Sequence, residues 1–152
     1  MGFKGKLAVD GSRVGVSEVR DFASLAPQRP ARVLYVEDNP DNLTLVMRIV
    51  ERHPHVQLIS APSAALGLDL ALSHRPDLIL LDVHLPDGTG YGLLERLRAH
   101  EATRAIPAVA VTANAMPHED VRALDAGFAA YVTKPIDVRK FDSMLRGMLG
   151  RR

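Results

Sequence analysis

Five short apolar segments recur along the chain from Arg32 onward, and each is separated from the next by a segment with helical periodicity. The apolar segments are Val33–Val36, Val56–Ile59, Leu78–Leu81, Ala108–Val111 and Ala129–Val132. Runs of this length and composition predict strands that are buried on both faces. Their alternation with helices through short connections predicts right-handed β–α–β units, and hence an α/β fold with helices on both faces of a parallel sheet.

The first expected helix begins soon after the first of these strands. Apolar residues at i, i+3, i+4 and i+7 are expected to form its buried face: Leu43, Val46, Met47 and Val50. Leu45 and Ile49 lie largely off this stripe. Because the outward face of such a helix normally carries charge, an exposed pair of apolar residues there is a candidate docking patch.

The last two expected helices carry recognisable terminal residues. Pro117 is placed to open the fourth helix, and Gly127 to end it. Asp137 is the expected N-cap of the fifth helix. Its expected buried face consists of Phe141, Met144, Leu145 and Met148. Residues 64–73 and 93–98 continue the helical pattern in the middle of the chain, so five helices are expected.

The composition is that of an ordinary soluble protein with one domain. The 152 residues are 47% hydrophobic and 24% charged, with a formal net charge of +1. This charge argues against direct binding of nucleic acid or of an anionic membrane. The chain has no cysteine, no secretory signal and no apolar run near the ~18 residues of a membrane span. The expected location is the cytoplasm.

The first thirty residues differ from the rest of the chain. They are rich in glycine, serine and charged residues, show no sustained period, and close on Pro27 and Pro30. We interpret residues 1–30 as a linker, a flexible arm or a sequence added for expression, and residues 31–150 as the folded domain.

Polar side chains follow four of the five expected strands. They are Glu37 and Asp38 after the first strand, Asp82 at the end of the third, Thr112 after the fourth, and Lys134, followed by Pro135, after the fifth. Ligands of open α/β sheets bind outside the carboxyl ends of the strands, where the strand order reverses. Each residue alone is more often a turn or cap former. Their joint placement at one sheet edge predicts a functional site.

Three neighbouring carboxylates require a cation. Two like charges ~4 Å apart repel by about 4 kcal/mol at an effective dielectric constant of about 20. Oxygen ligands without cysteine or histidine side chains favour a hard ion, and Mg²⁺, which keeps several waters, fits such a set. The ammonium group of Lys134 and the hydroxyl of Thr112 would then suit an anionic phosphoryl group.

Four segments carry a family resemblance: VEDNPDN, LILLDVHLPDGTG, AVTANA and YVTKPID. Together they resemble the motifs of response-regulator receiver domains, the CheY-like modules of two-component signalling. The resemblance covers Arg32 to Gly150. It implies a flavodoxin-like, doubly wound sheet of five parallel strands in the order 2-1-3-4-5, with five helices.

The resemblance also implies a role for each matching residue. Asp82 would be the phosphoacceptor and also a Mg²⁺ ligand, Asp38 a direct Mg²⁺ ligand, Glu37 its partner, often through water, and the backbone carbonyl of His84 a further ligand. Thr112 would be the switch hydroxyl, Lys134 the phosphate-binding lysine, Pro135 the residue after a cis peptide bond, and Tyr131 the aromatic residue that moves with the switch. These are expectations from position in the motifs.

Two further sets of residues are expected to adjust the function. In this family the residues two positions after the acceptor and after the switch hydroxyl influence how fast the phosphoryl group is lost, and here they are His84 and Asn114. The side chain of His84 could equally be a plain exposed group. Leu45, Ile49 and Ile136 are expected to dock a helical phosphohistidine domain; alternatively, Leu45 and Ile49 only cover neighbouring loops or the N-terminal arm.

Other functional classes fit the sequence less well. The segment GTGYG lacks the third glycine of a dinucleotide-binding fingerprint, since Leu93 occupies that position. A phosphatase of the haloacid-dehalogenase type would need Asp-x-Asp, whereas the chain has Asp82, Val83 and His84. No P-loop is present in the sequence.

The function that the resemblance implies is that of a phosphorelay receiver. It would take a phosphoryl group from a histidine kinase or histidine phosphotransfer protein with Mg²⁺ as cofactor, and would then switch binding to a downstream protein target. It would be catalytic only in its own phosphorylation and dephosphorylation. Two contexts stay open: a stand-alone receiver, or the C-terminal receiver of a hybrid histidine kinase.

Overall fold

The computed structural model describes residues 29–113 and 116–150. Their main sheet is parallel and has the strand order β2-β1-β3-β6-β7, which is the predicted order 2-1-3-4-5. Its strands are β1 (Ala31–Val36), β2 (Val56–Ala61), β3 (Leu78–Asp82), β6 (Ala108–Thr112) and β7 (Ala130–Thr133). Each lies within two residues of the expected segment. The expectation for the N-terminal segment falls almost entirely outside the described residues.

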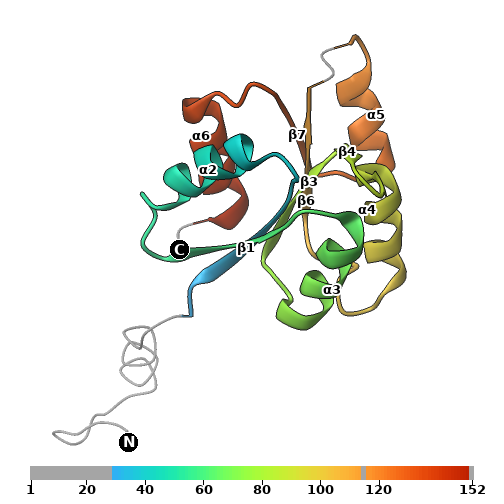
Figure 1. Ribbon diagram of the computed structural model, residues 1–152, viewed down its shortest axis with the longest axis horizontal. Helices are drawn as coiled ribbons and strands as arrows, with labels where there is room; N and C mark the ends of the chain where they lie inside the picture. The colour runs from blue at the N-terminus through green and yellow to red at the C-terminus, as the bar shows by residue number, and fades with distance from the viewer. Residues whose placement is uncertain (1–28, 114–115, 151–152) are drawn as a thin grey trace, which may run out of the picture.

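Helices cover both faces of the sheet, as the alternation predicted. They are α2 (Pro40–Val50), α3 (Ala64–His74), α4 (Gly90–Ala99), α5 (Glu119–Ala126) and α6 (Val138–Leu149). Figure 1 shows α2 and α6 on one face, and α3, α4 and α5 on the other. None of the helices among the described residues is both long and apolar enough to cross a membrane.

The sheet separates two apolar cores. Successive residues of β1 point to opposite faces, so Leu34 and Val36 join the core under α3, α4 and α5, while Val33 and Tyr35 join the core under α2 and α6. Every residue of β3 and β6 is buried. Strands buried on both faces explain why these segments are continuously apolar and do not alternate with polar residues.

Helix ends follow the expected signals, with one shift. Asp137 caps α6 by accepting a hydrogen bond from the backbone N–H of Lys140, and Gly127 ends α5 with a φ of 110°. The expected opening of α5 at Pro117 was wrong by two residues. The helix starts at Glu119, after His118 adopts a left-handed conformation with a φ of 76°.

The predicted buried face of the first helix was partly wrong. Val46 and Val50 are buried as expected, but Met47 is 44% exposed and Ile49 is only 2% exposed. Six of the eleven residues of α2 are apolar, so two overlapping stripes were available. The helix is rotated so that Ile49 faces the sheet, with Leu43 and Leu45 partly buried against the same core.

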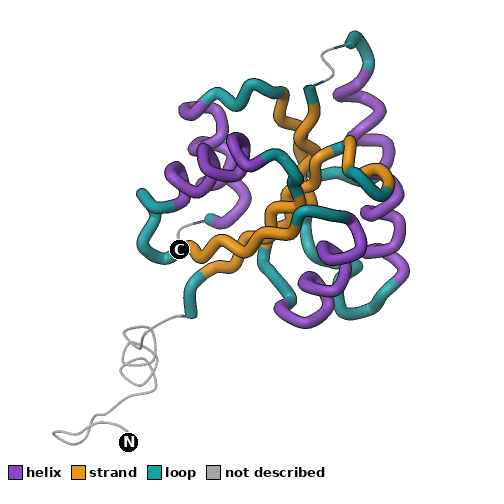
Figure 2. Tube along the Cα trace, in the orientation of Figure 1, coloured by secondary structure: helices purple, strands orange, loops and turns teal. Residues whose placement is uncertain are grey.

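A small antiparallel hairpin, which the sequence analysis did not anticipate, follows the third parallel strand. It consists of β4 (His84–Leu85) and β5 (Gly88–Thr89), in which His84 pairs with Thr89 and Leu85 with Gly88. Figure 2 shows these two short strands apart from the main sheet, next to α4. The two residues at its tip, Pro86 and Asp87, belong to a turn-forming sequence.

Candidate phosphoryl-transfer site

The site lies at the carboxyl edge of the sheet, between β1 and β3. Val36 pairs with Leu81 in the parallel register, so the next residues, Glu37 and Asp82, lie side by side. The strand order reverses at this point, because β2 lies on one side of β1 and β3 lies on the other. Glu37 and Asp82 are 3% and 4% exposed, respectively.

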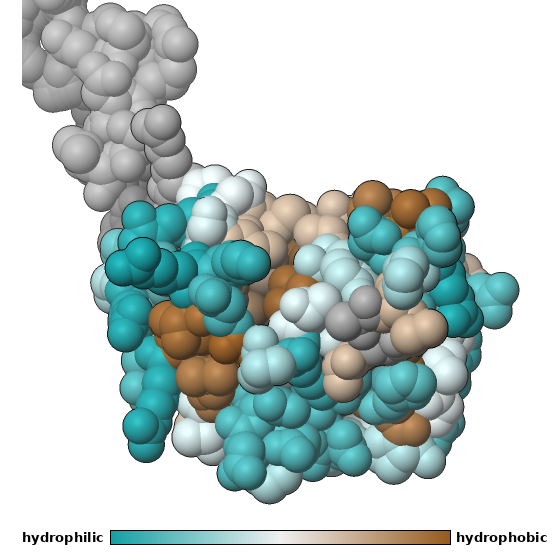
Figure 3. Space-filling model, turned by 90° about the horizontal axis from the view of Figure 1, so that it is seen from above, coloured by the Kyte–Doolittle hydropathy of each residue, from teal (hydrophilic) through white to brown (hydrophobic). Residues whose placement is uncertain are grey.

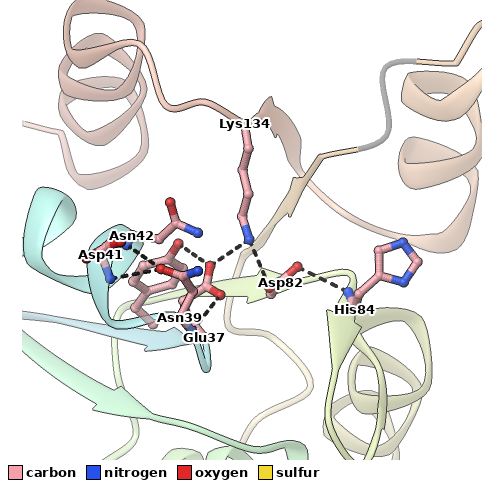
Figure 4. A network of polar contacts seen from close by, with 8 residues as sticks. Glu37, Asn39, Asp41, Asn42, Asp82, His84 and Lys134 are labelled. Carbon is pink, nitrogen blue, oxygen red and sulfur yellow. Dashed lines mark hydrogen bonds and ion pairs between the residues drawn. The ribbon is translucent and has the colours of Figure 1, made fainter.

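Lys134 joins these two carboxylates. Its Nζ atom lies 2.8 Å from Oε1 of Glu37 and 2.9 Å from Oδ2 of Asp82 (Figure 4). The lysine follows β7, and its backbone N–H donates to the carbonyl of Thr112. Burial disfavours the charge on Lys134, but its hydrogen bonds to Glu37 and Asp82 outweigh that effect and raise its pKa. The ammonium group is therefore a permanent positive charge in the site.

Glu37 is held in its ionised form by several donors. Besides Lys134, it accepts hydrogen bonds from the hydroxyl of Tyr35 at 2.8 Å and from the backbone N–H of Asn39 at 3.1 Å. Burial would raise the pKa of Glu37, but the hydrogen bonds, that from Lys134 first among them, lower it overall. The Asn39 side chain in turn accepts from the N–H groups of Asp41 and Asn42, which fixes the start of α2.

Asp82 has the opposite electrostatic environment. Burial and the neighbouring Glu37 raise its pKa to about 6, although Lys134 and the N–H of His84 favour the charged form. That N–H donates to Oδ1 of Asp82 at 3.1 Å. Two adjacent carboxylates whose pKa values are moved apart are typical of groups with different chemical roles. Asp82 is the one whose negative charge is least stabilised.

A divalent cation fits beside these groups. Carboxylate oxygens of Glu37, Asp38 and Asp82 lie within 4.8 Å of one another, and Asp38 is exposed to solvent. An oxygen-only set with one open side suits Mg²⁺, which retains several waters. The observation that supports this fit is the donor chemistry: Lys134 pairs with Glu37 and Asp82, and the third carboxylate, Asp38, lies beside them, which leaves negative charge to be neutralised.

The other predicted site residues that the structure describes lie on or just after β4, β6 and β7. Thr112 is fully buried at the end of β6, and Tyr131 on β7 is half-buried against the core under α3, α4 and α5. The peptide bond between Lys134 and Pro135 is cis. The side chain of His84 is exposed, and its backbone lies beside Asp82. Asn114 lies outside the described residues.

The expected docking patch is not present as predicted. Ile49 is part of the core, and Ile136 is only 7% exposed, while Leu45 is partly buried. Burial against the sheet and α6 explains why the helix carries these apolar residues. The exposed apolar residue on α2 is Met47. Seen from above, an apolar patch is present on the side of the molecule that α2 and α6 form (Figure 3).

Two residues of the site were missed by the sequence analysis. Tyr35 lies in the middle of a strand, and its apolar neighbours gave no sign that its hydroxyl reaches Glu37. Gly90 is needed for close approach, because a Cβ atom there would lie 2.6 Å from the carbonyl oxygen of Asp82. The glycine-rich segment GTGYG, residues 88–92, was the available signal for the second.

A second polar cluster links α4 to α5 on the same side of the sheet as Tyr131. The hydroxyl of Tyr91 donates to Oε2 of the buried Glu119 at 2.6 Å. The guanidinium of Arg122 lies 4.4 Å from the centre of the Tyr91 ring, and the Phe128 ring packs against Tyr91 in a T-shaped arrangement. Burial, followed by the hydrogen bond to Glu119, raises the pKa of Tyr91 to about 12, so the tyrosine remains a donor.

Known proteins share this fold and sequence pattern. The family model of the response regulator receiver domain matches residues 33–146. The chain is 38% identical over 121 residues to the polar-differentiation response regulator DivK of Brucella anthropi, covering 80% of this chain and 98% of that protein. It is 39% identical over 118 residues to DivK of Brucella ovis, covering 78% and 95%.

Solved structures agree with this match. The receiver domain of a sensor histidine kinase from Pseudomonas aeruginosa, solved with a magnesium ion in its active site cleft, aligns with a TM-score of 0.71 at 30% identity, covering 80% of this chain and 98% of that one. A CheY-like receiver domain protein from Methanospirillum hungatei gives 0.69 at 30% identity, covering 79% and 94%. This chain therefore belongs to the response regulator receiver domain family of two-component signalling proteins.

Proposed function

We propose that Asp82 is the residue that accepts the phosphoryl group in this receiver domain. The observation that carries the proposal is its environment. Asp82 ends the central strand, is held by Lys134 and the N–H of His84, and lies beside two further carboxylates. Its raised pKa indicates a carboxylate whose negative charge is poorly stabilised. Donation of an electron pair from this carboxylate to the phosphorus atom of an incoming phosphoryl group is therefore favoured.

The transfer is an in-line displacement at phosphorus. A carboxylate oxygen of Asp82 forms a bond to phosphorus while the bond from phosphorus to the imidazole nitrogen of the donor histidine breaks. The electron pair of that bond stays on the imidazole nitrogen. Lys134, whose Nζ lies 2.9 Å from Oδ2 of Asp82, would hold a phosphoryl oxygen, and the Thr112 hydroxyl would hold another.

Asp38, Glu37, Asp82 and the carbonyl of His84 are the groups that would hold Mg²⁺. When bound, the ion neutralises charge on the phosphoryl oxygens. Glu37 contributes a carboxylate that stays ionised because Lys134, Tyr35 and Asn39 donate to it. Asp38 contributes the carboxylate that faces solvent.

The same site would catalyse loss of the phosphoryl group. Water attacks phosphorus, the bond to the Asp82 oxygen breaks, and inorganic phosphate leaves with the carboxylate restored. His84, whose side chain is exposed, and Asn114 are proposed to tune the rate of this hydrolysis. On this proposal the chain has no separate small-molecule substrate.

The proposed output is a change of surface on the α5 side of the sheet. Thr112 moves toward the added phosphoryl group, and Tyr131 follows into the space next to the core under α3, α4 and α5. The contact of Tyr91 with Glu119 holds the start of α5 in the unphosphorylated form. Rearrangement of α5 would then change the affinity for a downstream protein target.

The proposed donor is a histidine kinase or histidine phosphotransfer protein in the cytoplasm. Its helical phosphohistidine domain would contact the outward face of α2, where Met47 now replaces Leu45 and Ile49 as the expected apolar contact. Residues 31–150 form the proposed receiver unit, and residues 1–30 a linker or arm. Both a stand-alone receiver and a receiver of a hybrid kinase are compatible with this donor.

The proposal is tested with acetyl phosphate and Mg²⁺. Intact-mass measurement should show one added phosphoryl group that is stable to acid and labile to base. Asp82→Asn should abolish it, because the amide is not a competent nucleophile, whereas Asp142→Asn, on α6 and away from the site, should be labelled normally. Labelling of Asp82→Asn at the wild-type rate would refute the assignment.

A further inference from the structure

The hairpin formed by β4 and β5 delivers the backbone of His84 to the acceptor carboxylate. His84 lies on β4, and its N–H contacts Oδ1 of Asp82 at 3.1 Å. The base of the hairpin is closed by a hydrogen bond from the N–H of Gly90 to the carbonyl of Val83 at 2.9 Å. The orientation of this hairpin therefore decides where the amide and carbonyl of His84 lie relative to Asp82.

The tip of the hairpin is held by Asp87. Its Oδ1 accepts a hydrogen bond from the N–H of Ala64 at 2.7 Å, and its Oδ2 accepts from the N–H of Ala65 at 3.0 Å. Both oxygens thus engage the first turn of α3, which lies 22 and 23 residues earlier in the chain. The two backbone N–H groups lower the pKa of Asp87, so the carboxylate is charged where the helix dipole favours it.

The helix that receives Asp87 is itself packed against β1. A Cβ atom at Gly67 on α3 would lie only 2.8 Å from a methyl group of Val36, so helix and strand are in close contact there. Val36 directly precedes Glu37. Asp87 therefore connects the hairpin, which carries His84, to α3, which packs beside the strand that leads to Glu37. His84 and Glu37 lie on two sides of the proposed metal site.

We propose that Asp87 is a positioning residue of the phosphoryl-transfer site. It fixes the hairpin through α3, and through the hairpin it fixes the amide and carbonyl of His84 beside Asp82. The expected effect of Asp87 on Mg²⁺ binding rests on the proposed function. Its effect on the position of His84 does not, because that position can be measured in the metal-free protein.

The alternative is that Asp87 only caps α3, and the chain offers a matched control for it. The hydroxyl of Ser63 accepts a hydrogen bond from the N–H of Leu66 at 3.2 Å in the same first turn. Ser63→Ala removes a capping contact of α3 without touching the hairpin. Asp87→Ala removes contacts of α3 and the hold on the hairpin together.

The first measurement is hydrogen exchange at the His84 amide in metal-free wild type, Asp87→Ala, Asp87→Asn and Ser63→Ala. Asp87→Ala should speed exchange at His84 at least tenfold. Asp87→Asn, which keeps one acceptor oxygen, should lie between it and the wild type and carries the test if the alanine variant does not fold. Ser63→Ala should leave exchange at His84 unchanged while it lowers the melting temperature.

The second measurement is Mg²⁺ titration of the same four proteins. The dissociation constant should rise at least threefold in Asp87→Ala and should not change in Ser63→Ala. If Asp87→Ala matches Ser63→Ala in both measurements, Asp87 is only a helix cap and the inference is overturned. If the wild type is not labelled at Asp82 by acetyl phosphate, the proposed function fails instead, and the exchange data, taken without metal or donor, still decide on Asp87.

Discussion

The two faces of the sheet are held together by different kinds of contact. Under α2 and α6 the packing is mainly apolar, with Phe141 and Leu145 fully buried against the sheet, and the polar contact that joins these elements, His53 with Asp142, lies beyond the end of α2. The other face has an apolar core as well, but directed polar contacts join its elements. Asp87 binds the start of α3, and Tyr91 on α4 binds Glu119 on α5.

This difference indicates where a switch can act. Apolar burial depends little on direction and resists change as a whole, because packed interiors leave no free space. A hydrogen bond is directional and can be exchanged for another at a modest net cost. Tyr131, on the strand that precedes Lys134, packs on the face with the polar contacts. We therefore expect phosphorylation to reshape the α3, α4 and α5 face and to leave the α2 and α6 face in place.

The largest expected effect comes from truncating one aromatic residue on each face. Phe141→Ala and Phe128→Ala both remove a buried ring, and each should lower the free energy of unfolding by about 3–5 kcal/mol. The variants should differ in function. Chemical denaturation gives the stability of each, and NMR with beryllium fluoride as a phosphate mimic gives the response.

Phe128 contacts the ring of Tyr91, whereas Phe141 does not belong to that cluster. The folded fraction of Phe141→Ala should therefore keep the amide shift changes in α5 on adding the mimic, and Phe128→Ala should lose or alter them. Identical responses of the two variants would mean that the faces do not differ as we describe.

The second effect concerns Asp82, which lies between the faces. Its pKa is raised to about 6 in the folded protein from an ordinary value of 3.8. The folded state thus holds the proton more tightly than the unfolded chain does. The free energy of unfolding therefore falls as the pH rises from 3.8 to about 6, and it falls no further above about pH 6. Asp82→Asn should therefore be more stable than the wild type at pH 7.5 without metal, by on the order of 1–3 kcal/mol.

Urea denaturation at several pH values measures this difference. The advantage of Asp82→Asn should shrink below pH 6 and disappear near pH 4, and Mg²⁺ should reduce it at neutral pH by stabilising the wild type. A variant that is less stable than the wild type at every pH would contradict the account of Asp82 as a poorly stabilised charge.

The third effect compares two tyrosine hydroxyls. Tyr35→Phe removes a donor to Glu37 under the α2 and α6 face, and Tyr91→Phe removes the donor to Glu119 on the other. Each should lower the free energy of unfolding by about 1 kcal/mol. Tyr35→Phe should also raise the pKa of Glu37, because a donor to its carboxylate is lost, and so weaken Mg²⁺ binding at acidic pH.

Tyr91→Phe should leave Mg²⁺ affinity unchanged and should increase the shift changes in α5 that the phosphate mimic produces. Mg²⁺ titration and NMR on both variants separate the two functions. A common effect on both readouts in both variants would show that the two hydroxyls act only through overall stability.

The smallest effect is expected at the outer end of the α2 and α6 face. His53, just after α2, lies 2.5 Å from Asp142 on α6, and this hydrogen bond is the main cause that lowers the pKa of Asp142. Because the pKa of Asp142 is lowered, the pair stabilises the fold at pH values above 3.8. This stabilisation is lost as the pH falls below 3.8. Asp142→Asn should be slightly less stable at neutral pH, with a deficit that disappears in acid.

Thermal unfolding of Asp142→Asn between pH 3 and pH 7 checks this, with Arg146→Gln as the control for the i, i+4 pair on the same helix. Labelling by acetyl phosphate should be normal in both variants. A reduced labelling rate would show that this face also communicates with the site.

The strands and most of the site could be predicted because they depend on short-range pattern. Short apolar runs such as Leu78–Leu81, repeated between helical segments, predict strands that are covered on both faces. Asp137 and Gly127 were correctly expected at helix ends because capping depends on the residue itself and its immediate neighbours.

The rotation of α2 could not be predicted in this way. With apolar residues at Leu45, Met47 and Ile49 as well as at the positions that are buried, the periodicity supported two orientations. The position of β1 and α6 selects the one that buries Ile49 and exposes Met47. The docking hypothesis for Ile49 failed for this reason.

By itself, the sequence determined which residues reach the carboxyl edge of the sheet, because the ends of parallel strands meet there whatever the details of packing. It also determined the chemistry of that edge, which is acidic groups with one lysine. Only the tertiary structure decided how these groups differ. Glu37 is stabilised by Tyr35 and Asn39, Asp82 is left poorly stabilised, and Asp87 reaches α3, because each depends on contacts made across the fold at distances of a few ångströms.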